Sequence, residues 1–106
     1  MIAAALALAS ALPGHAYTIL SPGTASCGQW ISDHNYASGA NLHAEESWVA
    51  GYLSGYNRFV PGNGNITASI DSAGWTAWIT NYCREKPLVP LVKAADALIA
   101  ELKTRR

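Results

Sequence analysis

Apolar residues recur at helical spacing along two long stretches of the chain. In the first, between residues 45 and 60, they fall three or four positions apart, which is the spacing of one helix face. The members of this stripe are Trp48, Val49, Tyr52, Leu53, Tyr56 and Val60. The second stretch has the same spacing and comprises Leu88, Leu91, Val92, Ala95, Leu98, Ile99 and Leu102. Both stretches therefore predict amphipathic helices, and the second has the most regular pattern in the chain.

Residues that commonly begin or end helices divide the chain into four helical segments. Ser26-Cys27-Gly28-Gln29 has the form of a capping box, in which the serine caps a short first helix and the glutamine reaches back to it. Asn41 is the expected cap of the second helix, and Asp71 that of the third. Pro87 ends the third helix, and the fourth begins near Pro87 or Pro90.

The same pattern predicts the fold class. No segment alternates between apolar and polar residues with the period of a strand. Residues 17–25 are expected to form an extended N-terminal arm, and residues 26–106 one helical domain. The predicted fold is all-α, a small four-helix domain.

Residues 1–16 have the composition of a secretory signal peptide. This run is apolar, too short to span a bilayer, and ends in the small-x-small triplet Gly14-His15-Ala16. Cleavage is therefore expected before Tyr17. No Lys or Arg precedes the apolar run, so either the true start lies a few residues upstream or the signal is a weak one. The predicted location is periplasmic or secreted, with no membrane span after the signal is removed.

The remaining chain contains two cysteines, Cys27 and Cys83. In a small exported domain we expect them to form one internal disulfide, which joins the start of the first helix to the end of the third. The chain-entropy model assigns about 4 kcal/mol to a bridge that closes a loop of roughly 57 residues. The alternatives are two free thiols or a bridge to another chain.

Small residues form a second stripe on the predicted second helix, at Ser47, Gly51 and Gly55. Glycine inside a helix lowers stability by about 1 kcal/mol relative to alanine. Gly51 and Gly55 are therefore predicted to be helix-packing residues that let another backbone approach closely, unless Gly55 helps a bend.

Charge is sparse, with seven Lys or Arg residues balancing seven Asp or Glu residues. Arg58 is the only cation between Tyr17 and Cys83, whereas six cations follow Cys83. Basic residues near the end of a C-terminal helix explain part of this asymmetry. A nucleic-acid interface requires a stronger basic stripe, so no nucleic-acid partner is expected.

No sequence pattern points convincingly to catalysis or to a cofactor. A P-loop, a dinucleotide fingerprint and a C-x-x-C motif are all missing, and Gly51-Tyr52-Leu53-Ser54-Gly55 is not a nucleophile elbow. Asp33, His34, His43 and Glu46 could in principle hold a metal, but they lack a recognised spacing and are typical of a solvated surface. We expect no enzyme activity, no metal and no cofactor.

The chain is rich in aromatic residues, most of which lie on the apolar side of their predicted helices and are expected in the core. Tyr56, Asn57, Arg58 and Phe59 are the exception, because they adjoin the Gly-rich loop from Pro61 to Asn65. Tyrosine and arginine are enriched in interface hot spots. These four residues are the predicted interaction surface.

Two motifs resemble those of small exported helical proteins. The cysteine placement resembles that of the HdeA-type periplasmic acid-stress chaperones, in the segments Cys27-Gly28-Gln29-Trp30, Asn81-Tyr82-Cys83-Arg84-Glu85-Lys86-Pro87 and Leu88 to Leu102. The Gly51-Tyr52-Leu53-Ser54-Gly55 helix is similar to that of the Tai-type immunity proteins of contact-dependent secretion systems. The similarity covers roughly Ser26 to Leu102.

Each resemblance implies a function without catalysis. The first implies a stress chaperone that captures unfolded proteins in acid, although this chain has fewer titratable groups than those chaperones. The second implies an immunity protein that binds and inhibits a secreted toxin enzyme. The expected function is a protein-binding or protective one, with another protein as partner, and the sequence predicts neither the partner's identity nor the oligomeric state.

Overall fold

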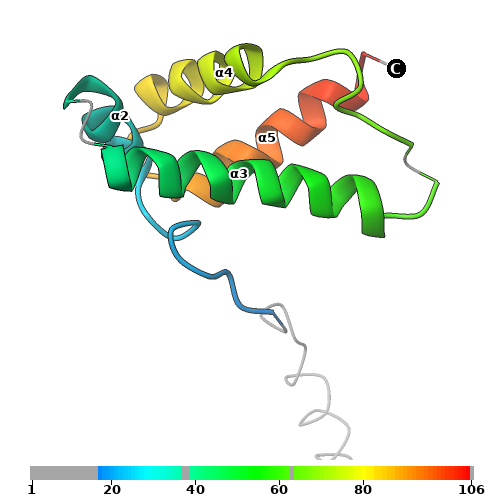
Figure 1. Cartoon of the computed structure of the whole chain (residues 1–106), viewed down its shortest axis with the longest axis horizontal. Coiled ribbons are helices and arrows are strands. Elements are labelled where there is room, and N and C mark those ends of the chain that lie inside the picture. Colours follow the sequence, from blue (N-terminus) through cyan, green and yellow to red (C-terminus); the bar gives the residue numbers. More distant parts are fainter. Residues whose placement is uncertain (1–16, 37–38, 63, 106) are drawn as a thin grey trace, which may run out of the picture.

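The computed structural model describes residues 17–36, 39–62 and 64–105. Within these ranges the chain forms four helices and no β-strand (Figure 1): α2 (Cys27–Tyr36), α3 (Gly39–Phe59), α4 (Ser72–Glu85) and α5 (Leu91–Lys103). The predicted all-α, four-helix fold is confirmed. The predicted signal peptide, residues 1–16, lies outside the described residues.

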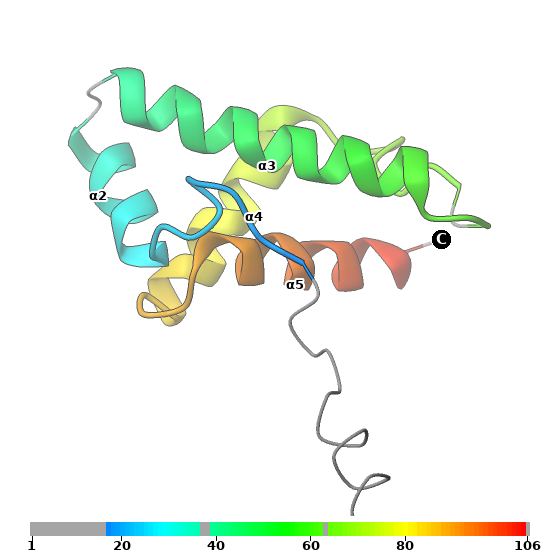
Figure 2. The same ribbon diagram turned by 90° about the horizontal axis from the view of Figure 1, so that it is seen from below.

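Helix α5 joins the other helices into one body. It packs against both α3 and α4, and the short α2 contacts the other three helices at one end of the molecule. The two views show α3 and α5 running side by side, with α2 at the end where α3 begins (Figure 2). The opposite end holds the last turn of α3 and the loop that leads to α4.

The core lies where these four helices meet. It contains most of the apolar stripe that was predicted for α5. Leu88 was predicted to belong to this stripe, but it lies in the loop before α5 and is 92% exposed. Every other helix contributes at least one apolar side chain that is almost fully enclosed. These core residues are Trp30, Val49, Leu53, Ile79, Leu91, Ala94, Ala95, Leu98, Ile99 and Leu102.

The loop before α5 caps the start of α2. The N–H groups of Cys27 and Gly28 donate to the carbonyl oxygens of Val89 and Pro87, at 2.7 and 2.8 Å. The first N–H groups of a helix have no partner inside that helix. The neighbouring loop supplies acceptors for two of them.

The N-terminal arm caps α5 in the same way. The N–H groups of Leu91 and Val92 donate to the carbonyl oxygens of Ala25 and Gly23, at 2.7 and 2.9 Å. Pro90, the residue before α5, offers no side-chain cap. The arm is therefore not extended throughout as predicted, because it turns at residues 21–24 and then pairs with the loop through Ser26 and Pro90.

The predicted boundaries hold for α4 but not for the start of α3. Asp71 caps α4 by accepting a hydrogen bond from the Gly74 N–H at 2.8 Å, and the helix ends at Glu85, two residues before Pro87. Helix α3 begins at Gly39, so Asn41 lies within its first turn. The prediction that Asn41 caps this helix is wrong, because the residues before it already have helical backbone.

The predicted packing role of Gly51 and Gly55 is also wrong. A Cβ atom at either position would have no neighbouring atom within 4 Å outside the helix itself. Helix α3 buries its Val49 and Leu53 side chains, and Gly51 lies two positions from each, which places it on the exposed side. The Ser47, Gly51, Gly55 stripe is an open helix face.

None of the helices in the described residues is long and apolar enough to cross a membrane.

Candidate functional site

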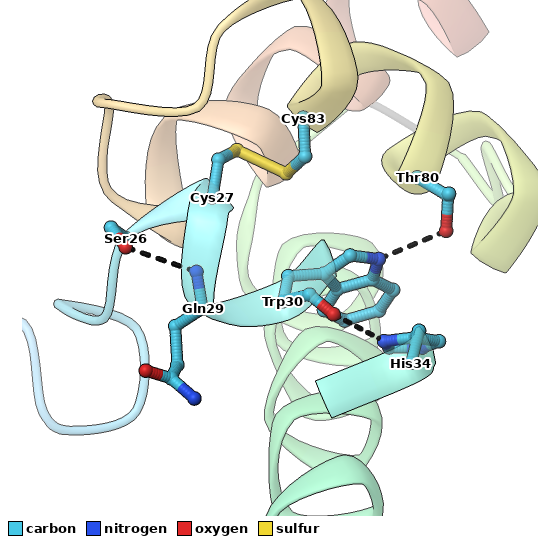
Figure 3. The surroundings of a disulfide bond; sticks show 7 residues. All are labelled: Ser26, Cys27, Gln29, Trp30, His34, Thr80 and Cys83. Carbon is cyan, nitrogen blue, oxygen red and sulfur yellow. Dashed lines mark hydrogen bonds between the residues drawn. A yellow bond between two sulfur atoms is a disulfide. The ribbon is translucent and has the colours of Figure 1, made fainter. Parts of the chain in front are cut away.

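The start of α2 is covalently joined to α4 (Figure 3). Cys27 and Cys83 form the predicted disulfide, with their Cα atoms 4.8 Å apart. Ser26 caps α2 as predicted, since its Oγ accepts a hydrogen bond from the Gln29 N–H at 3.0 Å. The Gln29 side chain does not reach back, however. Its Nε2 donates forward to Asp33 Oδ1 at 2.9 Å, so only half of the predicted capping box forms.

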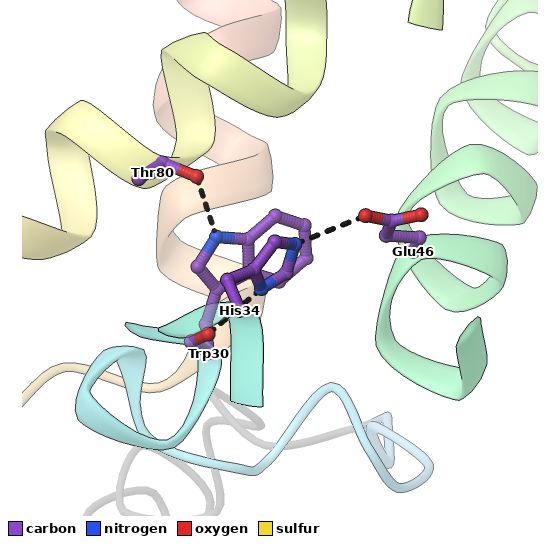
Figure 4. A network of polar contacts seen from close by, with 4 residues as sticks. All are labelled: Trp30, His34, Glu46 and Thr80. Carbon is purple, nitrogen blue, oxygen red and sulfur yellow. Dashed lines mark hydrogen bonds and ion pairs between the residues drawn. The ribbon is translucent and has the colours of Figure 1, made fainter. Parts of the chain in front are cut away.

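Trp30 connects α2 to α4 one turn further along. Its indole is fully buried, and Nε1 donates to Thr80 Oγ1 at 2.9 Å. The His34 ring stacks on this indole with the ring centroids 4.1 Å apart (Figure 4). A buried indole with a satisfied N–H fixes the position of the side chain that stacks on it.

His34 connects α2 to α3. Its Nδ1 lies 2.8 Å from the Trp30 carbonyl oxygen, and its Nε2 lies 3.0 Å from Glu46 Oε2. A carbonyl oxygen and a carboxylate oxygen can only accept hydrogen bonds. The His34 ring therefore bridges the α2 backbone and the Glu46 carboxylate, and its tautomer decides which nitrogen donates.

Asp33 and Glu45 form a pair of buried acids at the same helix junction. They are only 6% and 3% exposed. Burial, followed by the hydrogen bond with Asp33 and its negative charge, raises the pKa of Glu45 to about 8. The hydrogen bond from Glu45 is the main cause that lowers the pKa of Asp33. The two shifts favour a proton on Glu45 beside an ionised Asp33.

Sequence reasoning did not find this buried pair, although a signal was present. Glu45 lies four positions before Val49 and eight before Leu53, so helical spacing places it on the buried face of α3. Asp33 follows Trp30 by three positions on α2 and shares its buried side.

The four residues considered as metal ligands do not come together. His34 and Glu46 form an ion pair, but Asp33 is held by Gln29 and Glu45, and His43 is exposed. In the part of the chain that the structure describes, no group of three or more His, Cys, Asp or Glu side chains is placed to hold a metal ion.

The four residues of the predicted interaction surface have two different environments. Tyr56 is half-buried and packs against the core. Asn57 anchors the loop, since its Nδ2 donates to Thr67 Oγ1 at 2.9 Å and its Oδ1 accepts from the Ile66 N–H at 3.0 Å. Arg58 and Phe59 are exposed, and the guanidinium carbon lies 5.3 Å from the phenyl centroid.

An open hollow adjoins these residues. It is bordered by the end of α3 and by the loop that follows, in a volume of about 660 Å³. Its lining includes Ser54, Asn57, Arg58, Val60, Pro61, Gly62, Gly64 and Asn65. We call the exposed residues Arg58, Phe59 and Val60, together with this hollow, the α3-end surface.

Comparison with known proteins adds no relative: no family model, no curated protein and no solved structure matches this chain. The resemblances to HdeA-type chaperones and Tai-type immunity proteins therefore remain predictions from short motifs.

Proposed function

We propose that this chain is a small exported protein that binds another protein without catalysis, and that it does so through the α3-end surface. The observation that carries the proposal is Phe59, an aromatic side chain 73% exposed at the end of a helix. Arg58 lies against its ring, and Val60 continues the apolar surface. Aromatic and arginine side chains supply much of the binding energy of protein interfaces.

The residues next to the surface support the proposal because they hold it in place. Tyr56 packs into the core, and the two hydrogen bonds of Asn57 tie the end of α3 to the segment at Ile66 and Thr67. A surface that is ordered before binding loses less conformational entropy when a partner docks.

Export is part of the same proposal. The Cys27–Cys83 disulfide fits an oxidising compartment such as the periplasm or the exterior of the cell. The chain would then meet its partner outside the cytosol.

Two kinds of partner agree with the motif resemblances. An HdeA-like chaperone would capture many unfolded clients after acid loosens its own fold, whereas a Tai-like inhibitor would bind one folded toxin enzyme at neutral pH. The preformed surface favours the second kind, because it is exposed without any unfolding.

The test is capture of proteins from a periplasmic extract by the immobilised chain, at pH 7 and at pH 3. Arg58→Ala/Phe59→Ala removes one cation and one exposed aromatic ring from the surface. Lys86→Ala/Leu88→Ala is the matched control, because it removes one exposed cation and one exposed apolar side chain at the opposite end of the molecule. Circular dichroism of both variants verifies that each is folded.

A single protein captured in a one-to-one complex at pH 7, lost with the surface variant and kept with the control, supports the inhibitor. Many proteins captured only at pH 3 support the chaperone. Capture that both variants retain equally would show that the binding surface lies elsewhere. Failure to capture any protein at either pH would contradict the proposed function.

A further inference from the structure

The buried charged side chains of the described residues, Asp33 on α2 and Glu45 on α3, lie where these two helices meet. The disulfide joins α2 to α4, and the reciprocal caps join α2 to α5. Helix α3 has no such link to α2 in the described residues. Polar side chains at this junction come instead from two adjacent pairs, Asp33 and His34 on α2 and Glu45 and Glu46 on α3.

Hydrogen-bond chemistry limits the charge states of the buried acids. Asp33 Oδ2 and Glu45 Oε1 are buried and have no donor among the described side chains. Two ionised carboxylates cannot bond to each other, since both only accept. A proton on one of them converts this repulsion into a hydrogen bond.

The neighbouring contact between His34 and Glu46 lies at the same junction. His34 Nε2 is 3.0 Å from Glu46 Oε2, and its Nδ1 is 2.8 Å from the Trp30 carbonyl oxygen. Ionisation of both Asp33 and Glu45 places two like charges side by side between the helices and therefore weakens the contact between α2 and α3.

The charged side chains of α4 and α5 do not neutralise the acids at the α2–α3 junction. On α4, Arg84 borders the same hollow as Glu46 but is bonded to Asn81, at 3.3 Å. On α5, Lys93 and Asp96 are exposed and line a separate hollow with Tyr52, whose hydroxyl donates to Asp96 at 2.6 Å. No cation from α4 or α5 forms an ion pair with the acids of the junction in the described structure.

We propose that the α2–α3 junction is a pH-sensitive latch, which is closed while Glu45 carries a proton and loosens in alkaline solution when Asp33 and Glu45 are both ionised. The latch releases the start of α3 and leaves the disulfide-linked helices together. It does not depend on the protein-binding function, because it concerns the opposite end of α3 from the α3-end surface.

The expected pH dependence follows from proton linkage. The folded chain keeps the Glu45 proton up to about pH 8, whereas the unfolded chain releases it near pH 4.5. Stability contributed by this proton is therefore complete below about pH 4.5 and is lost as the pH rises to about 8. Within this range the folded chain holds one proton more than the unfolded chain. The ratio of folded to unfolded chain therefore falls roughly tenfold with each pH unit.

Carboxyl carbon-13 NMR of the oxidised full-length chain between pH 4 and pH 10 tests the latch directly. We expect the Glu45 carboxyl to titrate near pH 8, and the hydrogen-exchange protection of residues 39–46 to fall by tenfold or more between about pH 5 and pH 8, where the opened junction has already released this proton. Glu45→Gln should abolish that fall, because its amide donates to Asp33 at every pH. Glu85→Gln, which changes an exposed acid of α4, is the matched control and should behave as the unmodified chain.

A Glu45 resonance that titrates near pH 4.5 would overturn the proposal, as would an equal loss of protection in Glu45→Gln. If that variant does not fold, Asp33→Asn gives an independent answer. Its amide can donate to ionised Glu45, so the Glu45 titration should move down toward 4.5. If Glu45 still titrates near pH 8 in Asp33→Asn, Asp33 is not the cause of its raised pKa.

Discussion

Two glycines in this chain have opposite surroundings. Gly23 is buried in the arm, where an added Cβ atom would overlap the Trp48 ring. Gly51 is exposed in the middle of α3, where an added Cβ atom would meet nothing within 4 Å. At Gly51 the glycine lowers the helical propensity of α3 without gaining any contact.

We expect Gly51→Ala to raise the free energy of unfolding by about 1 kcal/mol, because alanine restricts the unfolded chain and favours the helix. Gly23→Ala should lower it instead, because the aromatic ring must move. Urea denaturation of both variants measures the two effects. A loss of stability in Gly51→Ala would mean that another backbone packs against this face after all.

At the scale of the helices, the start of α2 is held by two kinds of link. The disulfide joins it to the end of α4, and four backbone hydrogen bonds connect the first turns of α2 and α5 to the segments that precede the other helix. These hydrogen bonds satisfy N–H groups that would otherwise need side-chain caps, which explains why Pro90 is tolerated before α5.

Removing the disulfide should lower the free energy of unfolding by about 4 kcal/mol in the chain-entropy model. Cys27→Ala/Cys83→Ala tests this, with guanidinium unfolding of the oxidised and the substituted chains. The first turns of α2 and α5 should show the greatest increase in hydrogen exchange, because their caps include residues close to Cys27. Unfolding curves that coincide would mean that the caps alone hold these helices together.

The buried acids predict a maximum of stability in mildly acidic solution. The pKa of Asp33 is lowered, so its contribution is complete above about pH 3.8 and is lost as the pH falls through its folded value. The Glu45 contribution changes in the opposite sense, and it is lost between about pH 4.5 and pH 8. The urea midpoint should therefore be higher at pH 5 than at either pH 3 or pH 8. A midpoint that rises steadily from pH 5 to pH 8 would contradict the buried pair.

Across the whole molecule, local patterns predicted the helices well and predicted contacts between helices less well. Ser26 and Asp71 cap their helices as expected because a cap depends on a few neighbouring residues. The disulfide was predicted correctly because a chain with two cysteines allows only one internal pairing. Gly51 was misassigned because a small residue fits both an open face and a close contact, and sequence spacing does not distinguish the two.

In the candidate sites, too, contacts between distant residues were harder to predict than local features. Arg58 and Phe59 were predicted to be available for binding, and both are exposed. Asn57 instead holds the loop through Ile66 and Thr67, contacts nine and ten residues away that no local motif indicates. The pairing of Asp33 with Glu45 depends on how α2 docks on α3, which is a property of the folded chain.

The molecule is thus divided between a cross-linked end and an exposed end. The disulfide, the reciprocal caps and the buried acids involve α2 and the segments beside it, and the α3-end surface lies at the other end of α3, whose course Figure 1 shows. This division lets variants at one end be tested without changing the contacts that hold the other.

The most direct test of the proposed function is a calorimetric titration of the captured partner with three forms of the chain at neutral pH. We predict one-to-one binding by the unmodified chain, at least tenfold weaker binding by Arg58→Ala/Phe59→Ala, and unchanged binding by Lys86→Ala/Leu88→Ala. A tenfold change corresponds to about 1.4 kcal/mol, which is within the range expected for one hot-spot side chain. Equal affinities for all three forms would contradict binding through the α3-end surface.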